Sequence, residues 1–116
     1  MLFATAVLLL GNCSRSKTEA FLPGTYVNYS RGELSEADDT LEVKASGASN
    51  FIISRHTGYH LIRRGKLGKR EHESEIWYGV YDQASGVLTE TKKGRQFTIF
   101  PDSGFIKVGS RKYVKQ

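Results

Sequence analysis

Only one of the 116 residues is a cysteine, so an intramolecular disulfide is excluded and a packed core must hold the fold. The longest near-apolar run, residues 2–10, is nine residues long, whereas a membrane-spanning helix needs about 20. The sequence also has no phosphate-binding loop, dinucleotide fingerprint, nucleophile elbow or zinc-protease motif. These absences leave the common enzyme classes without a sequence signal.

Cationic side chains outnumber anionic ones, 17 to 12, which gives a net charge of +5. Residues 1–12 carry no charged side chain, so the whole excess belongs to the rest of the chain. Such an excess suggests anionic neighbours, for example lipid headgroups, acidic glycans or nucleic acid. The length and the hydrophobic content of 39% fit a single folded domain.

The apolar run at residues 2–10 has the length of the hydrophobic region of a secretory signal. The tetrapeptide that closes it, Leu10-Gly11-Asn12-Cys13, resembles the lipobox of bacterial lipoproteins, in which the cysteine is acylated and becomes the new N-terminus. Asn12 departs from the small residue that is usual before the cysteine. The resemblance implies a signal peptide over residues 1–12, a lipid on Cys13 and a polar tether over residues 13–20.

The alternative is that the same N-terminal residues form a core element with a buried, unmodified Cys13. The polar stretch over residues 14–19 follows at once, and it suits a tether better than a core element. A single acyl chain holds a protein only marginally, and the diacylated, N-acylated cysteine of the lipoprotein family meets the need for several chains. We therefore expect a protein anchored in the bacterial cell envelope, in the outer membrane in preference to the inner one.

Residues 21–116 predict one all-β domain, because short runs rich in Val, Ile, Thr, Tyr and Phe alternate with Gly, Asp, Ser and Asn. One helical turn is expected within residues 30–38. Glycines at the ends of four short loops suit the hairpins of an antiparallel meander. We expect the meander to form a small barrel or a two-layer sandwich. The expected strands are Thr25–Tyr29, Thr40–Lys44, Phe51–His56, Tyr59–Arg63, Glu75–Tyr81, Val87–Thr91, Arg95–Phe100, Phe105–Val108 and Arg111–Lys115.

Two further resemblances concern this domain. Gly24-Thr25-Tyr26 is similar to the opening of lipocalin-like barrels, which implies that Tyr26 plugs the barrel floor and suggests a carrier of a small apolar ligand. The chain also looks like small lipoproteins of the Bacteroides group. The features that carry this resemblance are the lipobox, the stretches 24–28, 39–41 and 77–82, and Lys112-Tyr113. Some members of that group accompany conjugation or secretion genes.

Candidate catalytic groups are few. His56 and His60 stand four residues apart, which in a strand separates them by about 13 Å, too far to share one metal ion. Carboxylates cluster over residues 33–39 and 71–75, and paired carboxylates support glycoside hydrolysis. A solvated strand edge is the simpler interpretation. We expect no metal, no cofactor and no enzymatic activity, and we keep a periplasmic hydrolase as an alternative.

The densest charge pattern lies within residues 63–70, where two glycines predict a flexible loop. Contact with anionic lipid or with an acidic partner is one interpretation, and a solvated hairpin tip is the other. No aromatic residue lies among these cations, so nucleic acid is not expected. A second candidate surface is aromatic. The cations are Arg63, Arg64, Lys66, Lys69 and Arg70, and the aromatic residues are Trp77, Tyr78 and Tyr81.

These features favour a non-enzymatic lipoprotein that acts as an envelope binding or scaffolding module, with a conjugation or secretion apparatus as one setting. Its partners would be the membrane, through the lipid, and an envelope protein or anionic lipid. The lipocalin-like carrier and the hydrolase are the alternatives.

The lipid anchor is tested by growing cells that express the chain with a palmitate analogue. We expect the wild-type protein to incorporate the label and Cys13→Ser to incorporate none, because serine cannot form the thioether. Equal labelling of both proteins, or a native protein with a free thiol at Cys13, would contradict the anchor.

Overall fold

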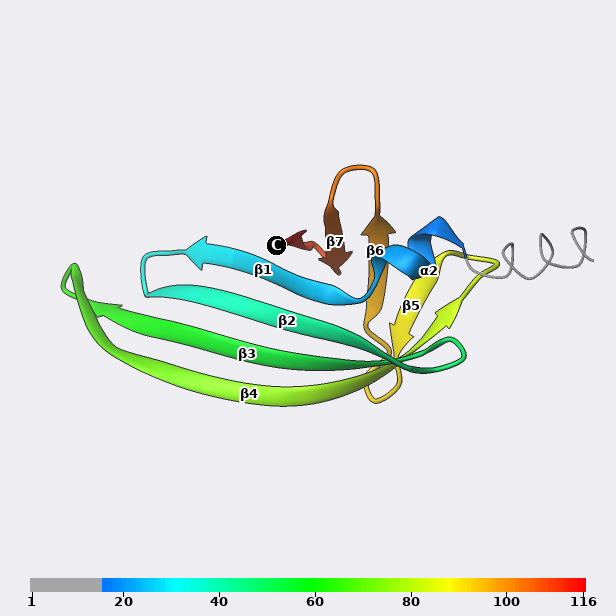
Figure 1. Ribbon diagram of the computed structural model, residues 1–116. Coiled ribbons are helices and arrows are strands. Elements are labelled where there is room, and N and C mark those ends of the chain that lie inside the picture. Colours follow the sequence, from blue (N-terminus) through cyan, green and yellow to red (C-terminus); the bar gives the residue numbers. More distant parts are fainter. Residues whose placement is uncertain (1–15) are drawn as a thin grey trace, which may run out of the picture.

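The computed structural model describes residues 16–116, which form one short helix and eight strands (Figure 1). Each strand pairs antiparallel with the next and β1 pairs with β8, so the sheet closes into a barrel. The expected all-β meander is confirmed, and the barrel is the closure that forms. The elements are α2 Lys17–Phe21, β1 Gly24–Arg31, β2 Ser35–Gly47, β3 Asn50–Arg63, β4 Lys66–Asp82, β5 Val87–Glu90, β6 Gln96–Phe100, β7 Phe105–Val108 and β8 Arg111–Lys115. The expected signal peptide over residues 1–12 and Cys13 lie outside the described residues.

Alternation along the strands decides which side chains enter the barrel. In β4, Trp77 and Tyr81 are buried, whereas Ile76, Tyr78 and Val80 point outward. In β2, Leu41 and Val43 are buried in the same way. The interior is filled by 13 hydrophobic side chains, as expected for a small barrel whose side chains meet at its axis. The core comprises Leu22, Tyr26, Leu41, Val43, Phe51, Ile53, Trp77, Tyr81, Leu88, Phe97, Ile99, Ile106 and Tyr113.

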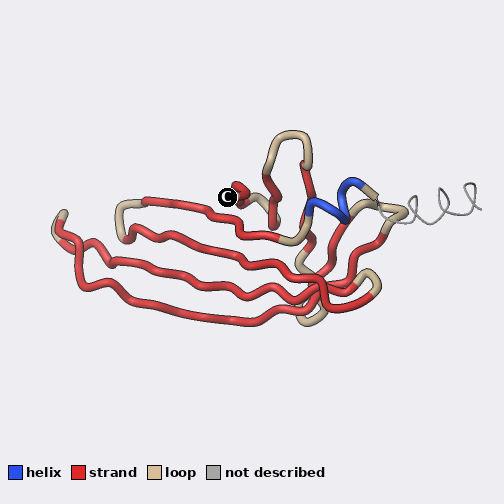
Figure 2. Tube along the Cα trace, viewed as in Figure 1, coloured by secondary structure: helices blue, strands red, loops and turns tan. Residues whose placement is uncertain are grey.

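Strand lengths differ sharply around the barrel. The strands β5–β8 have four or five residues, whereas β2, β3 and β4 have 13, 14 and 17. The short strands pair only with the inner ends of the long ones, since β8 meets β1 at Tyr26 and Val27 and β5 meets β4 at residues 79–82. Residues 28–38 and 57–74 therefore continue beyond the barrel as a four-stranded extension, the β arm (Figures 1 and 2).

The β arm corrects three expectations. Residues 30–38 form the end of β1 and the start of β2 rather than a helical turn. Residues 51–63 lie in one strand rather than two, because Gly58 continues the strand and leaves room for the guanidinium of Arg70 to cross it. The flexible loop expected over residues 63–70 is a hairpin with a two-residue turn, in which Arg64 and Gly65 have φ of 52° and 76°, the signs of the tight turns that match strand twist.

The end of the barrel opposite the β arm is closed by the N-terminal segment (Figure 1). Ser16 caps α2 by accepting a hydrogen bond from the backbone N–H of Glu19. Leu22 is fully buried behind the helix, and the buried Tyr26 hydroxyl contacts the carbonyl oxygens of Phe21 and Leu22 at 2.9 Å each. Residues 16–20 of the tether expected over 13–20 are thus part of a structured segment that packs on the barrel.

This closure is tested with Tyr26→Phe, which keeps the ring and removes the hydroxyl. We expect a loss of about 1 kcal/mol in the free energy of unfolding, the usual contribution of a hydrogen bond, and faster amide exchange over residues 16–22. Tyr29→Phe is the matched control, because Tyr29 lies on the same strand with its side chain exposed. Equal effects of the two substitutions would argue that the Tyr26 hydroxyl does not hold α2 to the barrel.

Candidate functional site at the barrel mouth and on the β arm

A buried carboxylate marks the mouth of the barrel, where the β arm begins. Asp39 lies on β2 and is only 3% exposed. Its oxygens accept hydrogen bonds from Arg55 Nε at 3.0 Å, Thr57 Oγ1 at 2.8 Å and Tyr113 Oη at 2.6 Å. Arg111 adds a more distant contact at 3.6 Å. The carboxylate is therefore fully partnered, as a buried charge must be if it is to remain ionised.

Arg55 connects this carboxylate to the open edge of the sheet. Its Nη1 donates to Glu75 Oε2 at 2.8 Å, and its guanidinium lies 5.4 Å from the centre of the Trp77 ring. The Trp77 indole N–H donates in turn to Glu75 Oε1 at 3.3 Å. Arg55 is thus fixed by two carboxylates and one aromatic ring, which leaves it little freedom to rearrange.

A second charged pair, Arg95 and Glu90, also lies beside Trp77. The guanidinium of Arg95 is 4.3 Å from the ring centre and pairs with the buried Glu90 at 3.0 Å. Glu90 also accepts hydrogen bonds from the backbone N–H groups of Lys92 and Lys93, so it closes the turn between β5 and β6. The ring of Trp77 therefore has two arginines within cation–π distance of its centre.

These contacts shift the pKa values of the groups involved. Burial alone would raise the pKa of Asp39, but the hydrogen bonds from Arg55, Tyr113 and Thr57 outweigh it and hold the pKa below its ordinary value. Burial, together with the hydrogen bond to Asp39, raises the pKa of Tyr113 to about 12. The pKa of Glu90 is also lowered, since its backbone and Arg95 hydrogen bonds overcome the effect of burial. All three groups keep their ordinary ionisation state at neutral pH.

The mouth contains a pocket of about 290 Å³, lined in part by Arg55, Arg95, Arg111 and Trp77. Three guanidinium groups around an indole would suit an anionic ligand. Each guanidinium already has a carboxylate partner, however, since Arg55 pairs with Asp39 and Glu75, Arg95 with Glu90, and Arg111 with Asp39. The charges balance within the mouth, and we assign this network a structural role.

The histidines and acids of the β arm do not converge. Alternation and register place His56, His60 and His72 on the outer face, whereas the glutamates of residues 71–75 share the inner face with Trp77. Within residues 16–116, no group of three or more His, Cys, Asp or Glu side chains is placed to hold a metal ion.

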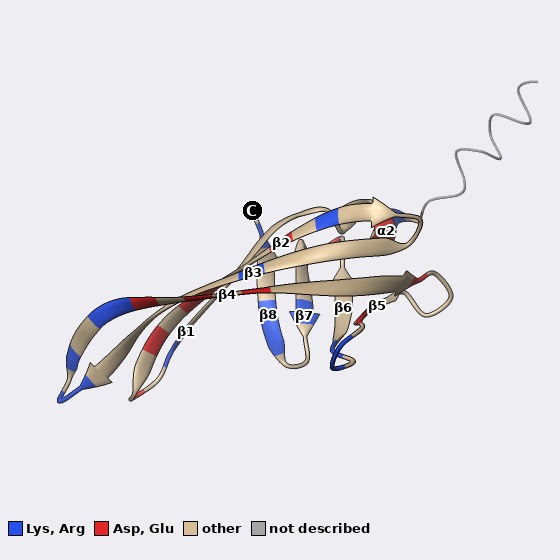
Figure 3. Cartoon of the chain, turned by 90° about the horizontal axis from the view of Figure 1, so that it is seen from below, with Lys and Arg blue, Asp and Glu red and all other residues tan. Residues whose placement is uncertain are grey.

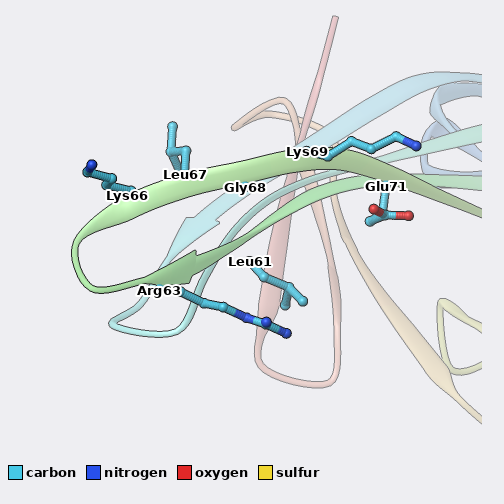
Figure 4. Close-up of a pocket in the computed structure, with 7 residues that line it drawn as sticks. All are labelled: Leu61, Arg63, Lys66, Leu67, Gly68, Lys69 and Glu71. Atoms are coloured by element: carbon cyan, nitrogen blue, oxygen red, sulfur yellow. The ribbon is translucent and has the colours of Figure 1, made fainter.

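The basic residues 63–70 gather at the tip of the β arm (Figure 3). A shallow pocket of about 350 Å³ lies there, and its lining includes Leu61, Leu67 and Lys69. Leu61 and Leu67 project from opposite sides of the hairpin (Figure 4). Leu34, in the neighbouring turn, is 77% exposed. The tip therefore presents cationic and apolar groups together.

The three residues of the expected aromatic surface do not share a face. Trp77 and Tyr81 are buried in the core, and only Tyr78 lies outward, 57% exposed. Tyr78 has Ile76 and Val80 as its neighbours on the outer face of β4. The aromatic surface expected from sequence is thus replaced by an aliphatic and tyrosine patch.

Asp39 and Arg55 belong to no motif that marks them as a pair in the sequence. Alternation along the strands could have shown that both side chains point inward. Asp39 precedes the apolar residues Leu41 and Val43 at intervals of two, and Arg55 follows Phe51 and Ile53 at the same interval. Inward-facing charges on neighbouring strands are a sign of a buried pair.

Comparisons with protein-family models, curated proteins and solved structures found no match for this chain. No helix within residues 16–116 has the length and apolar character that crossing a membrane requires.

The network around Asp39 is tested with Asp39→Ala, which leaves the buried Tyr113 hydroxyl without its acceptor and the half-buried Arg55 with Glu75 alone. We expect the free energy of unfolding to fall by about 3–5 kcal/mol, as when one partner of a buried ion pair is removed. Asp38→Ala is the matched control, because Asp38 pairs with Arg70 in a half-exposed position, where such a pair contributes about 0–1 kcal/mol. Similar losses in urea unfolding would contradict the assigned role.

The lowered pKa of Asp39 also determines how the stability of the fold changes with pH. The ionised carboxylate contributes stability fully above its ordinary pKa of 3.8, and this contribution disappears as the pH falls through the lower pKa of the folded state. We expect Asp39→Asn to be less stable than the wild type at pH 7 and to lose less stability on acidification.

Proposed function

We propose that this chain is a non-enzymatic lipoprotein of the bacterial cell envelope that binds a partner with its β arm. The observation that carries the proposal is the extension of four strands beyond the barrel. Every residue of β4 from Lys66 to Ile76 is exposed, so this part of the molecule adds little to the core. A two-faced, solvated sheet of this kind is explained by contact with another molecule.

The tip of the β arm supports this proposal. Leu34, Leu61 and Leu67 are exposed there beside the cations of residues 63–70. Each side of the hairpin thus places an apolar side chain beside cations, and binding surfaces combine apolar and charged groups in this way. The tip lies at the end of the molecule opposite α2 (Figure 1), so a lipid on Cys13 would leave it free to reach an envelope protein.

The two alternatives gain no support from the described residues. A carrier of a small apolar ligand needs a cavity, and the barrel interior is filled by its own side chains, Tyr26 and Tyr113 among them. A hydrolase needs an acid and a base in one cleft, and the histidines lie on the face of the β arm opposite to the glutamates of residues 71–75. Among those glutamates, the hydrogen bonds from Trp77 and Arg55 lower the pKa of Glu75, whereas a general acid needs a raised pKa. Neither alternative is proposed.

The proposal is tested in the bacterium that encodes the chain, with a photoreactive amino acid in place of Leu67 at the tip or Thr98 on the barrel wall. Both side chains are exposed, so access to the probe is matched. We expect a discrete adduct in the membrane fraction from position 67 and none from position 98. Equal adducts from both positions, or a chain recovered only in the soluble fraction, would contradict the proposal.

Charge reversal separates a specific tip contact from general attraction. With the probe kept at position 67, Arg64→Glu combined with Lys66→Glu should lower the yield of the adduct severalfold, because complementary charge drives encounter. Lys92→Glu combined with Lys93→Glu makes the same change on a barrel turn and should leave the yield unchanged.

A further inference from the structure

The outer edge of β4 is open over most of its length. β3 covers one side of β4 from Lys66 to Val80, but β5 covers the other side only at residues 79–82. Within residues 16–116, no strand pairs with the open side before Gly79, and only the carbonyl of Tyr78 is met there, by the backbone N–H of Thr91 at 2.8 Å. An open edge of this length is a template for an added strand.

The hydrogen bond from Thr91 to Tyr78 shows which residues of β4 direct their backbone groups to the open edge. In an antiparallel ladder, alternate residues direct both N–H and C=O to the same side. Because Tyr78 faces the open side, Ile76, Ser74 and His72 face it as well. Residues 71, 73 and 75 direct their backbone groups to β3. The edge thus offers three consecutive donor and acceptor sets to a partner in the extended conformation.

The side chains along this edge differ between the two faces of the sheet. Glu71, Glu73 and Glu75 lie on the inner face, and Ile76 and Tyr78 lie on the outer face, 60% and 57% exposed. Within residues 16–116, Glu75 is bound by Arg55, but neither Glu71 nor Glu73 forms an ion pair. A hollow of about 300 Å³ opens beside Glu73 and Glu75 at the edge. It is wide enough to receive the end of a long side chain.

A second copy of the chain, paired through the middle of this edge, brings like charges together. Residues directly opposite in an antiparallel pair share a face and direct their backbone groups alike. If β4 pairs symmetrically with the β4 of a second copy, each residue lies opposite the residue that is equally far from the centre of the pairing. A centre at Glu71 or at Glu73 places that glutamate opposite its own copy, and a centre at His72 places Glu71 opposite Glu73. Like charges directly opposite are destabilising. The complementary partner carries cations where this edge carries carboxylates.

We propose that the open edge of β4 binds an extended protein segment with a basic side chain at every second residue, which adds to the sheet as a further strand. The basic side chains lie over Glu71 and Glu73 on the inner face, and the alternate, apolar side chains lie beside Ile76 and Tyr78. The inference rests on the proposed binding role of the β arm and names the chemistry of the partner. It leaves the cationic tip free for a separate contact.

The test uses the full chain in a non-ionic detergent and a labelled eight-residue peptide that alternates lysine with valine and threonine. We expect saturable binding by fluorescence anisotropy, with slower amide exchange at His72, Ser74 and Ile76 and no change at Glu73. A peptide with glutamate in place of lysine should not bind. The same lysine peptide with N-methyl groups on alternate residues keeps every charge and loses the edge hydrogen bonds, so its Kd should rise about tenfold or more.

Two variants test the protein side. Ser74→Pro removes an N–H that faces the open edge, a position where a strand tolerates proline. We expect it to weaken peptide binding about tenfold, with the near-ultraviolet circular dichroism spectrum of the wild type as the check on folding. Glu73→Gln should weaken binding severalfold, and Glu33→Gln, in the exposed turn between β1 and β2, should not.

Equal binding of the N-methylated and unmodified peptides would overturn the proposal, since attraction between charges alone would then explain the contact. So would protection of His72 and Ser74 in a dimer that forms without peptide. Photoadducts at position 67 without peptide binding would overturn this inference and leave the proposed function standing. Peptide binding without photoadducts would leave this inference standing and would remove the tip from the proposed binding surface of the β arm.

Discussion

A mismatch of strand length governs this molecule. A barrel can close only where every strand has a neighbour on each side, and the four strands that complete the circle, β5–β8, have only four or five residues each. The strands β2, β3 and β4 are about three times longer. Their inner ends enclose the core, and their outer ends have nothing to close on. The β arm, its open edge and its exposed faces all result from this difference in strand length.

The Asp39 network lies where the closed and open parts meet. On the inner face of β2, the sequence passes from Leu41 and Val43 in the core to the buried Asp39, and on β3 it passes from Ile53 to Arg55. An ionised carboxylate with four partners ends the apolar interior without leaving a polar atom unsatisfied. Beyond it, polar side chains such as Asn28, Ser30 and Glu73 outnumber the apolar ones on the inner face of the β arm.

Much of the barrel could be predicted from the sequence, because half-buried strands alternate and glycines mark their turns. Gly86, Gly94, Gly104 and Gly109 have positive φ in the turns where the meander was expected. The β arm could not be predicted in this way. A strand exposed on both faces, such as residues 66–74, has no apolar alternation to detect, and Gly58 suggested a break because the crossing of Arg70 above it is a tertiary contact. The basic residues were recognised, but their place in a paired hairpin depends on β3, which no local pattern specifies.

The division of the molecule into a stable barrel and an open β arm can be measured by residue-resolved hydrogen exchange on the full chain. We expect amides in β5–β8 and in the inner halves of β1–β4 to exchange only by global unfolding. Amides at the tip, near residues 31–36 and 61–68, should exchange by local opening at a much smaller free energy. Tip amides protected as strongly as those of the barrel, in the monomer and without a partner, would contradict the division into a stable barrel and an open β arm.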